Sequence, residues 1–204
     1  MQGLNTPILR IAAEGWVFLC ALLAAALFAF FGGHWVLLSL LLLAVLLTGI
    51  YFRDAPRNTT ARPTGLLAPV DGTVSFRREC HDPWLGREAI RIGITVPLFC
   101  NYLLRAPVEG EVTAVEGAPK RVSCIRTDEG ESVLIVAGPL ALLGARPVWP
   151  AFGDRVGQGR ICGARRLARC IEVYLPADCR VEVKLGQQIR CGETVLATLL
   201  RRNA

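Results

Sequence analysis

An unbroken apolar stretch dominates the start of the chain. No Asp, Glu, Lys or Arg falls between Gly15 and Arg53, and the stretch is interrupted once, at Gly32-Gly33-His34. A straight helix needs about 17–25 apolar residues to cross the hydrocarbon core of a bilayer. The pattern therefore predicts a helical hairpin over residues 1–52, with helices at about 11–31 and 35–52, that is either transmembrane or re-entrant.

The pattern changes after residue 52. Pro, Asn and Thr are frequent in residues 53–65, which are predicted to be a linker. Over residues 66–204, Gly and Pro separate short runs rich in β-branched residues, which predicts a mainly β domain. The expected strands are Gly72–Phe76, Ala89–Thr95, Glu111–Val115, Ser132–Val136, Ile171–Leu175, Arg180–Lys184 and Thr194–Leu199, and only Gly138–Gly144 looks helical or irregular.

Two motifs occur twice in this domain. A-P-V-D-G-T-V at 68–74 recurs as A-P-V-E-G-E-V at 106–112, and G-x-x-V-x-x-G at 153–159 recurs as G-x-x-I-x-x-G at 186–192. Strands and glycine turns of this kind are the parts of a hammerhead or lipoyl-like β unit, in which glycine supplies the positive φ of a tight corner. The repeats predict a duplicated β domain, either a sandwich or a closed β structure.

The distribution of charge limits the kinds of ligand that the protein is expected to bind. The net charge is +6, and the densest basic stretch holds Arg160, Arg165, Arg166 and Arg169. This stretch is predicted to be a solvated basic face, or alternatively a surface that attracts anionic phospholipid headgroups. No aromatic-plus-basic module indicates nucleic-acid binding.

The eight cysteines form no C-x-x-C pair, and His34 and His81 are the only histidines. We therefore expect no metal site, and interpret the cysteines as buried free thiols in a reducing compartment. Both flanks of the hairpin are positive, with Arg10 before it and arginines 53, 57 and 62 after it. The positive-inside rule then places both flanks in the cytoplasm. The chain is expected in the cytoplasmic (inner) membrane, with its domain facing the cytoplasm.

In series, the motifs resemble the short, membrane-anchored form of the phosphatidylserine decarboxylases. The resemblance is carried by Phe52-Arg53-Asp54-Ala55-Pro56-Arg57, Ala68-Pro69-Val70-Asp71-Gly72, Arg105-Ala106-Pro107-Val108, Val173-Tyr174-Leu175-Pro176 and Gly192-Glu193-Thr194-Val195. It implies a proenzyme that cuts itself at a Gly-Ser bond and converts the serine into a pyruvoyl group. The ketone of that group forms a Schiff base with the substrate amine, and an Asp and a His assist the cleavage.

The sequence departs from the family at the residues that do this chemistry. Without a gap, the Gly-Ser pair falls on Ala168-Arg169 and the His falls on Tyr102. Asp71 is the retained assisting residue, although a turn-forming Asp before Gly72 also explains it. Arg105 is a substrate-binding candidate by resemblance. Cys170 is the only candidate replacement nucleophile, and otherwise a half-buried strand residue.

Three functions remain open at this point. The first is a phosphatidylserine decarboxylase-like protein of phospholipid metabolism that does not process itself and acts as a lipid-binding or regulatory partner of an active homologue, or self-associates. It would carry no cofactor. The second is an active decarboxylase that makes phosphatidylethanolamine with an atypical pyruvoyl centre. The third is a membrane-tethered lipoyl-like adaptor. A lipoyl or biotin carrier needs a Lys at an exposed turn, and the sequence alone leads us to expect neither Lys120 nor Lys184 in such a place.

Overall fold

The structure, a computed structural model, describes residues 10–11, 13–54, 57, 59, 62–97, 100–138 and 147–200. The chain divides into two compact units, Met1–Pro56 and Arg57–Ala204. The division falls within the segment that the sequence predicts to be a linker.

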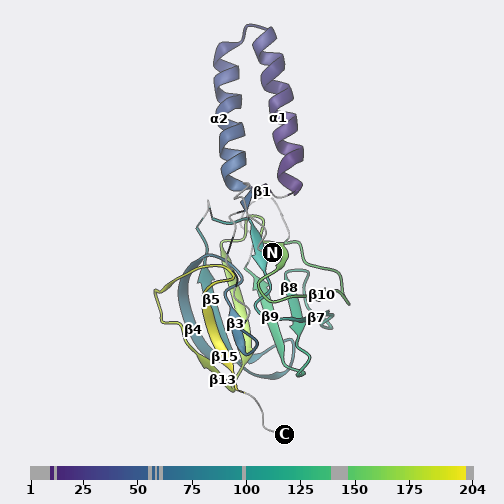
Figure 1. Ribbon diagram of the computed structural model, residues 1–204, viewed down its shortest axis with the longest axis vertical. Coiled ribbons are helices and arrows are strands. Elements are labelled where there is room, and N and C mark those ends of the chain that lie inside the picture. Colours follow the sequence, from purple (N-terminus) through teal and green to yellow (C-terminus); the bar gives the residue numbers. More distant parts are fainter. Residues whose placement is uncertain are drawn as a thin grey trace, which may run out of the picture. The chain divides into compact units, whose positions relative to one another are not determined.

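The first unit is an antiparallel helical hairpin (Figure 1). Helix α1 spans Ala13–Phe31, helix α2 spans Trp35–Tyr51, and Gly33 turns between them with a φ of 71°. Strands β1 (Arg10–Ile11) and β2 (Arg53–Asp54) pair antiparallel at its base. Both ends of the hairpin therefore lie side by side, which places its two positively charged flanks together.

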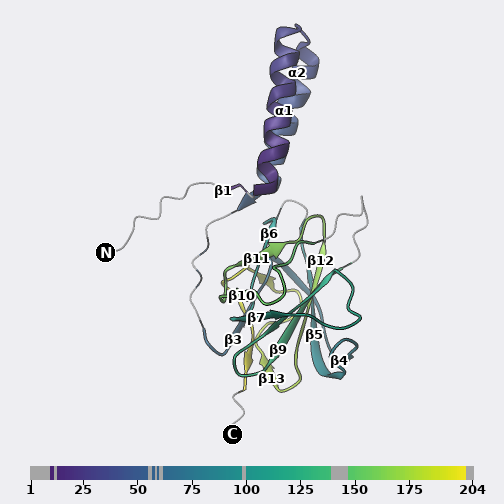
Figure 2. The same ribbon diagram turned by 90° about the vertical axis from the view of Figure 1, so that its right-hand side faces the viewer.

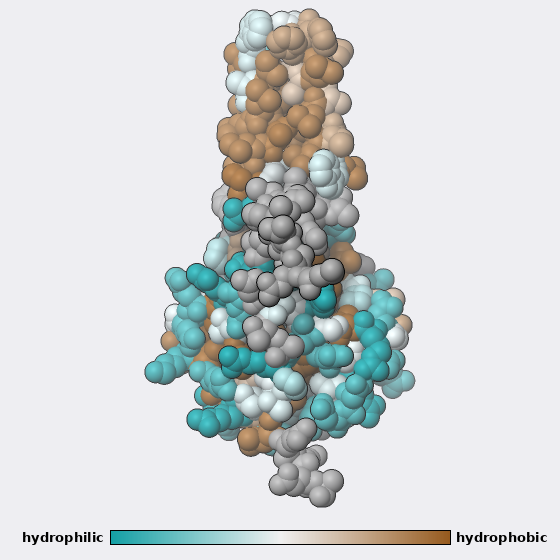
Figure 3. Space-filling model, viewed as in Figure 1, coloured by the Kyte–Doolittle hydropathy of each residue, from teal (hydrophilic) through white to brown (hydrophobic). Residues whose placement is uncertain are grey.

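The surface of the hairpin is apolar along its length, as the brown colouring in Figure 3 shows. Small side chains such as Ala26 and Ala29 are buried in α1, whereas Phe28 and Val36 are 81% and 77% exposed. Helix α1 is long and apolar enough to cross a membrane, and α2 is a shorter apolar helix of 17 residues. An exposed apolar surface of this extent is typical of membrane association.

The second unit is mainly β, which confirms the fold class predicted from the sequence. Its largest sheet is antiparallel, with the strand order β10-β7-β8-β9-β12-β5-β4-β14 (Figure 2 shows its central strands β9, β12, β5 and β4). The strands are β4 Gly72–Asp82, β5 Arg87–Thr95, β7 Gly110–Thr113, β8 Val122–Arg126, β9 Ser132–Ala137, β10 Arg155–Val156, β12 Cys170–Pro176 and β14 Gln188–Ile189.

Two smaller sheets complete the described part of this unit. One contains β13 (Cys179–Val181), β15 (Val195–Leu199) and β3 (Gly65–Leu67), and the other pairs β11 (Ile161–Ala164) with β6 (Leu103–Arg105). The main core forms on one face of the large sheet, because alternate residues of the central strands point the same way. Its fully buried members include Ile92, Ile94, Ile135, Ile171 and Val173.

Both copies of each sequence motif have equivalent structures, and each A-P-V segment pairs with the glycine turn of the other copy. The first A-P-V segment (68–74) is hydrogen bonded by the second glycine turn (186–192), through Gly192 N to Ala68 O at 2.8 Å and Gly186 N to Val74 O at 2.9 Å. The second A-P-V segment (106–112) is hydrogen bonded by the first glycine turn (153–159), through Gly159 N to Ala106 O at 2.8 Å and Gly153 N to Val112 O at 2.9 Å. The two segments also bond to each other, through Leu67 N to Pro107 O and Arg105 N to Pro69 O. The duplication is thus a reciprocal exchange in which each copy is completed by the other.

One glycine in each copy permits a close approach of two backbones. A Cβ on Gly110 would lie 2.1 Å from the carbonyl oxygen of Arg126, and a Cβ on Gly72 would lie 2.4 Å from that of Thr95. Neither backbone can move without breaking a strand pair. The D-G and E-G dipeptides of the repeats are therefore required by packing as well as by the turn.

The predicted strands are found with shifted ends. Strand β4 continues six residues beyond the predicted end at Phe76, through a charged stretch with Arg77, Arg78 and Glu79 exposed. Strands β3, β6, β8, β10, β11 and β14 were not among the expected strands, because each is a run of only two to five residues. The segment predicted as helical or irregular lies, from Pro139 onward, outside the described residues.

We predict that Gly110→Ala destabilises the β unit by about 1–3 kcal/mol, because the added methyl overpacks a backbone contact. Gly157→Ala is the matched control from a glycine turn, since its Cβ would meet only the flexible side chain of Arg160, at 3.3 Å. Thermal unfolding of the full chain in detergent, followed by tryptophan fluorescence, measures both. Equal midpoints for the two variants would show that the close approach at Gly110 is not required.

Candidate functional site

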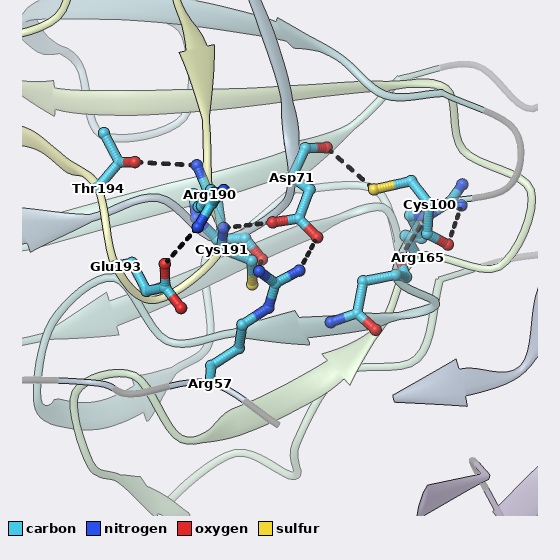
Figure 4. Close-up of polar contacts among 10 residues, drawn as sticks. Arg57, Asp71, Cys100, Arg165, Arg190, Cys191, Glu193 and Thr194 are labelled. Atoms are coloured by element: carbon cyan, nitrogen blue, oxygen red, sulfur yellow. Dashed lines mark hydrogen bonds and ion pairs between the residues drawn. The ribbon is translucent and has the colours of Figure 1, made fainter. Parts of the chain in front are cut away.

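Asp71 ends the loop before β4, and its carboxylate joins two remote parts of the chain (Figure 4). Oδ2 accepts a hydrogen bond in an ion pair from Arg57 Nη2 at 2.5 Å, and Oδ1 accepts one from the main-chain nitrogen of Cys191 at 2.7 Å. These partners lie 14 and 120 residues away in the sequence. A turn-forming aspartate needs only neighbours two or three residues on. Asp71 is instead a half-buried tie between distant segments.

Two thiols lie next to Asp71. Cys191 Sγ donates to the carbonyl oxygen of Pro69 at 3.1 Å, and Cys100 Sγ donates to that of Asp71 at 3.5 Å. Burial, and after it the charge of Asp71, raises the pKa of both thiols. Burial also raises the pKa of Cys162 to about 12. A thiol with a raised pKa is protonated at neutral pH, so these groups act as hydrogen-bond donors and not as nucleophiles.

The equivalent position in the second repeat is built differently. Glu109, which corresponds to Asp71, is exposed. Gln158, which corresponds to Cys191, donates through Nε2 to the carbonyl oxygens of Arg62, Gly65 and Pro107. Of the two halves, only the first therefore places a carboxylate inside the crossing, which singles out Asp71 as the candidate functional carboxylate.

The turn before β12 holds Ala168 and Arg169, on which the family resemblance would place the Gly-Ser pair. Ala168 is fully buried, and its carbonyl oxygen accepts a hydrogen bond from Arg165 Nη1 at 3.1 Å. Arg169 is exposed, and its carbonyl oxygen accepts one from the main-chain nitrogen of Val96 at 2.8 Å. Arg166 has a φ of 48°, the only non-glycine residue with positive φ in the described ranges. The turn is tightly bonded and contains no hydroxyl.

The prediction that the basic stretch is a solvated face is wrong for Arg165. Its side chain is fully buried, whereas Arg160 and Arg169 are exposed and Arg166 is half-buried. The guanidinium bonds to main-chain carbonyls of two loops, and these satisfy its donors away from water. No local feature separates Arg165 from the other arginines of the stretch, so the sequence carried no signal of its burial.

Tyr102 lies beside the turn before β12, and Arg105 lies beside the two glycine turns. Tyr102 is buried, and its carbonyl oxygen accepts a hydrogen bond from the main-chain nitrogen of Arg165 at 3.1 Å. Arg105, in β6, is buried and donates from Nη1 to the carbonyl oxygen of Gly159 at 3.1 Å. A Cβ on Gly192 would lie 3.0 Å from Arg105 Cδ, so the side chain of Arg105 touches both glycine turns.

Cys170 lies apart from Asp71. As the first residue of β12 it faces the same side of the sheet as Glu172 and Tyr174, opposite the core residue Ile171. Burial, and then the charge of Glu172, raises the pKa of its thiol, while Arg91 acts in the opposite direction. The charged groups around it are thus the bidentate Arg91–Glu172 pair on the outer face of the sheet.

The structure therefore groups the predicted site residues into three places. Asp71 lies with Arg57, Cys100 and Cys191, as Figure 4 shows. Arg105 belongs to the same place, because its side chain lies against Gly192, the residue after Cys191. Tyr102, Ala168 and Arg169 lie around the turn that Arg165 holds, and Cys170 lies on the outer face. No local motif indicates the roles of Arg57, Cys191 and Arg165, because their partners are main-chain or side-chain groups that are distant in the sequence.

We predict that Asp71→Asn lowers the free energy of unfolding by about 1–3 kcal/mol, because it removes a charge-assisted bond from a half-buried pair. Glu109→Gln is the matched control, since it makes the same chemical change at the exposed equivalent position. Chemical denaturation of the full chain in detergent compares the two. If both substitutions have the same effect, the tie through Arg57 does not stabilise the unit.

No family model matches the chain. Curated relatives do match it over nearly its full length. A phosphatidylserine decarboxylase proenzyme of Symbiobacterium thermophilum is 37% identical, with 98% of this chain and 99% of that protein covered. Proteins of the same name from Cupriavidus pinatubonensis and Nitrosomonas eutropha are each 32% identical, with 96% and 92% of this chain and 98% and 94% of those proteins covered. At this identity and coverage, the chain belongs to the phosphatidylserine decarboxylase family.

Proposed function

We propose that this chain is a membrane-anchored, phosphatidylserine decarboxylase-like protein of phospholipid metabolism that does not process itself. The observation that supports this most directly is the turn before β12, where Ala168-Arg169 replaces the Gly-Ser pair implied by the resemblance. None of the four serines, Ser39, Ser75, Ser123 and Ser132, lies in this turn. The turn therefore lacks a serine nucleophile for self-cleavage.

The residues at this position do not fit a pyruvoyl group. Its formation requires a side-chain hydroxyl or thiol that attacks the preceding carbonyl to form an ester or thioester. Elimination then leaves a dehydroalanyl residue, and hydrolysis of that residue with loss of ammonia gives the pyruvoyl ketone. The methyl group of Ala168 and the guanidinium of Arg169 can do neither. Tyr102 adds to the mismatch, because a phenol at the place of the assisting His is a poor base at neutral pH. Without the pyruvoyl ketone there is no electron sink for decarboxylation.

The hairpin supports a place in the cytoplasmic membrane. Helices of 19 and 17 residues extend about 28 and 26 Å, close to the roughly 30 Å hydrocarbon thickness of a bilayer. The antiparallel pairing of β1 with β2 holds the arginines of both flanks, Arg10 and Arg53, at one end. Positive flanks favour the cytoplasmic side, so the β unit is proposed to face the cytoplasm.

The retained β unit is proposed to act by binding. The chain matches its relatives over nearly their whole length, whereas the cleavage pair and the His position differ from the family pattern. This combination favours a protein that retains the fold and its binding surface but not the catalytic reaction. The partners proposed for that surface are anionic phospholipid headgroups, attracted by the net charge of +6, and an active homologue or a second copy of this chain. In that role it would regulate or support phospholipid synthesis at the membrane.

Intact mass tests the loss of processing. We predict a single species near 22.2 kDa that is unreactive toward carbonyl reagents, after incubation under conditions in which the Symbiobacterium thermophilum relative is processed. Carbon dioxide release from phosphatidylserine should be absent. Two fragments divided near residue 169, the smaller with a blocked N-terminus, would refute the proposal. Activity that Cys170→Ala abolishes would establish instead the alternative of an active decarboxylase with an atypical centre.

The topology of the hairpin gives a second prediction. If the hairpin spans the bilayer, a cysteine placed at its tip by His34→Cys, an exposed position with negative φ, should react with a membrane-impermeant maleimide on intact bacterial spheroplasts. The unsubstituted chain is the control, because its β-unit cysteines should react only after lysis. A tip cysteine that is labelled only after lysis, like the β unit, would show a re-entrant hairpin.

A further inference from the structure

The side chain of Arg165 is the largest of the fully buried side chains in the described ranges. Its three nitrogens all donate to main-chain carbonyl oxygens. Nε donates to Asn101 at 2.8 Å, Nη1 to Ala168 at 3.1 Å and Arg166 at 3.4 Å, and Nη2 to Cys100 at 3.0 Å and Pro97 at 3.4 Å. The acceptors therefore surround a flat, forked cation.

Those acceptors come from two segments that are far apart in the sequence. Pro97, Cys100 and Asn101 precede β6, whereas Arg166 and Ala168 belong to the turn before β12, and the Arg165–Asn101 bond joins residues 64 apart. The main chain adds one more bond between the segments, from Arg165 N to Tyr102 O. Figure 4 shows Arg165 beside Cys100, on the side away from Arg57. The guanidinium is the main side-chain link between the two segments.

The arrangement satisfies two requirements that would otherwise each cost free energy. A guanidinium keeps its charge in a protein interior, so it must be surrounded by acceptors. Irregular segments, in turn, contain carbonyl groups that no strand ladder pairs, and a buried unpaired carbonyl is unfavourable. A lysine could not replace the arginine, because one ammonium cannot present donors along three separate directions in a plane.

We propose that these two segments form a guanidinium-binding cradle, which Arg165 occupies in the native chain and which a free guanidinium ion can occupy when that side chain is removed. The cradle holds the carbonyl of Ala168 and the left-handed backbone of Arg166 in place. It does not depend on whether the chain forms a pyruvoyl group, so its test is separate from the test of processing.

The test uses the full chain in detergent and the variant Arg165→Ala, with Arg169→Ala as the exposed control from the same turn. Arg165→Ala should lower the apparent melting temperature by about 10 °C, because it leaves a set of buried acceptors unpaired. Amide hydrogen exchange should accelerate about tenfold or more in peptides covering residues 97–105 and 165–172. Arg169→Ala should change neither quantity.

Ligand rescue then tests the cradle itself. Guanidinium chloride at about 10 mM, far below molar denaturing concentrations, should restore the melting temperature and exchange of Arg165→Ala in a saturable way. Tetramethylammonium chloride should not, since it has no N–H donors. Arg165→Met should be destabilised but not rescued, because its side chain fills the space of the stem.

Two results would overturn the proposal. In the first, Arg165→Ala or Arg165→Met is as stable as the unsubstituted chain. In the second, Arg165→Ala is destabilised but guanidinium gives no more recovery than tetramethylammonium. If Arg165→Ala does not fold, Arg165→Lys and Arg165→Met decide the matter: full stability of either variant contradicts a cradle that recognises the guanidinium fork.

Discussion

The reciprocal bonding of two A-P-V segments by two glycine turns is the constraint on which the β unit depends. Each segment takes its hydrogen bonds from the turn of the other copy, so neither copy can complete its own backbone pairing. Gly72 and Gly110 allow the backbones to meet at equivalent points, with no room for a side chain. The large sheet and the main core extend outward from this crossing, because β4 and β7 both begin within it.

The same crossing explains why only one of two similar motifs became a candidate site. In one half, Asp71 faces Arg57 and the backbone of Cys191. In the other half, Gln158 supplies neutral amide donors to the surrounding carbonyls, and Glu109 remains in solvent. The neutral amide of Gln158 in one half and the Asp71–Arg57 ion pair in the other thus occupy equivalent positions of the two repeats. Duplication thus provides the frame, and divergence of a few side chains provides the site.

The turn before β12 shows how one side chain can order irregular backbone. A buried arginine there orders two irregular segments by pairing their carbonyl groups, including that of Ala168. Desolvation of the guanidinium opposes this arrangement, and several charge-assisted bonds offset it. The turn before β12 is thus a well-bonded structural element.

The amino-acid sequence by itself determined the hairpin, the mainly β domain, the two repeats and the family, because each of these depends on local patterns. Absence of charge over residues 16–52 suffices to predict apolar helices, and alternation with glycine suffices to predict strands. Family membership, likewise, followed from short motifs in series.

Only the tertiary structure decided which turn completes which strand, which carboxylate is paired and which arginine is buried. Arg160, Arg165, Arg166 and Arg169 have similar surroundings in the sequence, yet one of them is fully buried. Its environment is set by carbonyl groups of a loop more than sixty residues away. Hydrogen bonding and desolvation act through space, so the chemistry of a polar side chain is fixed by the groups that folding brings to it.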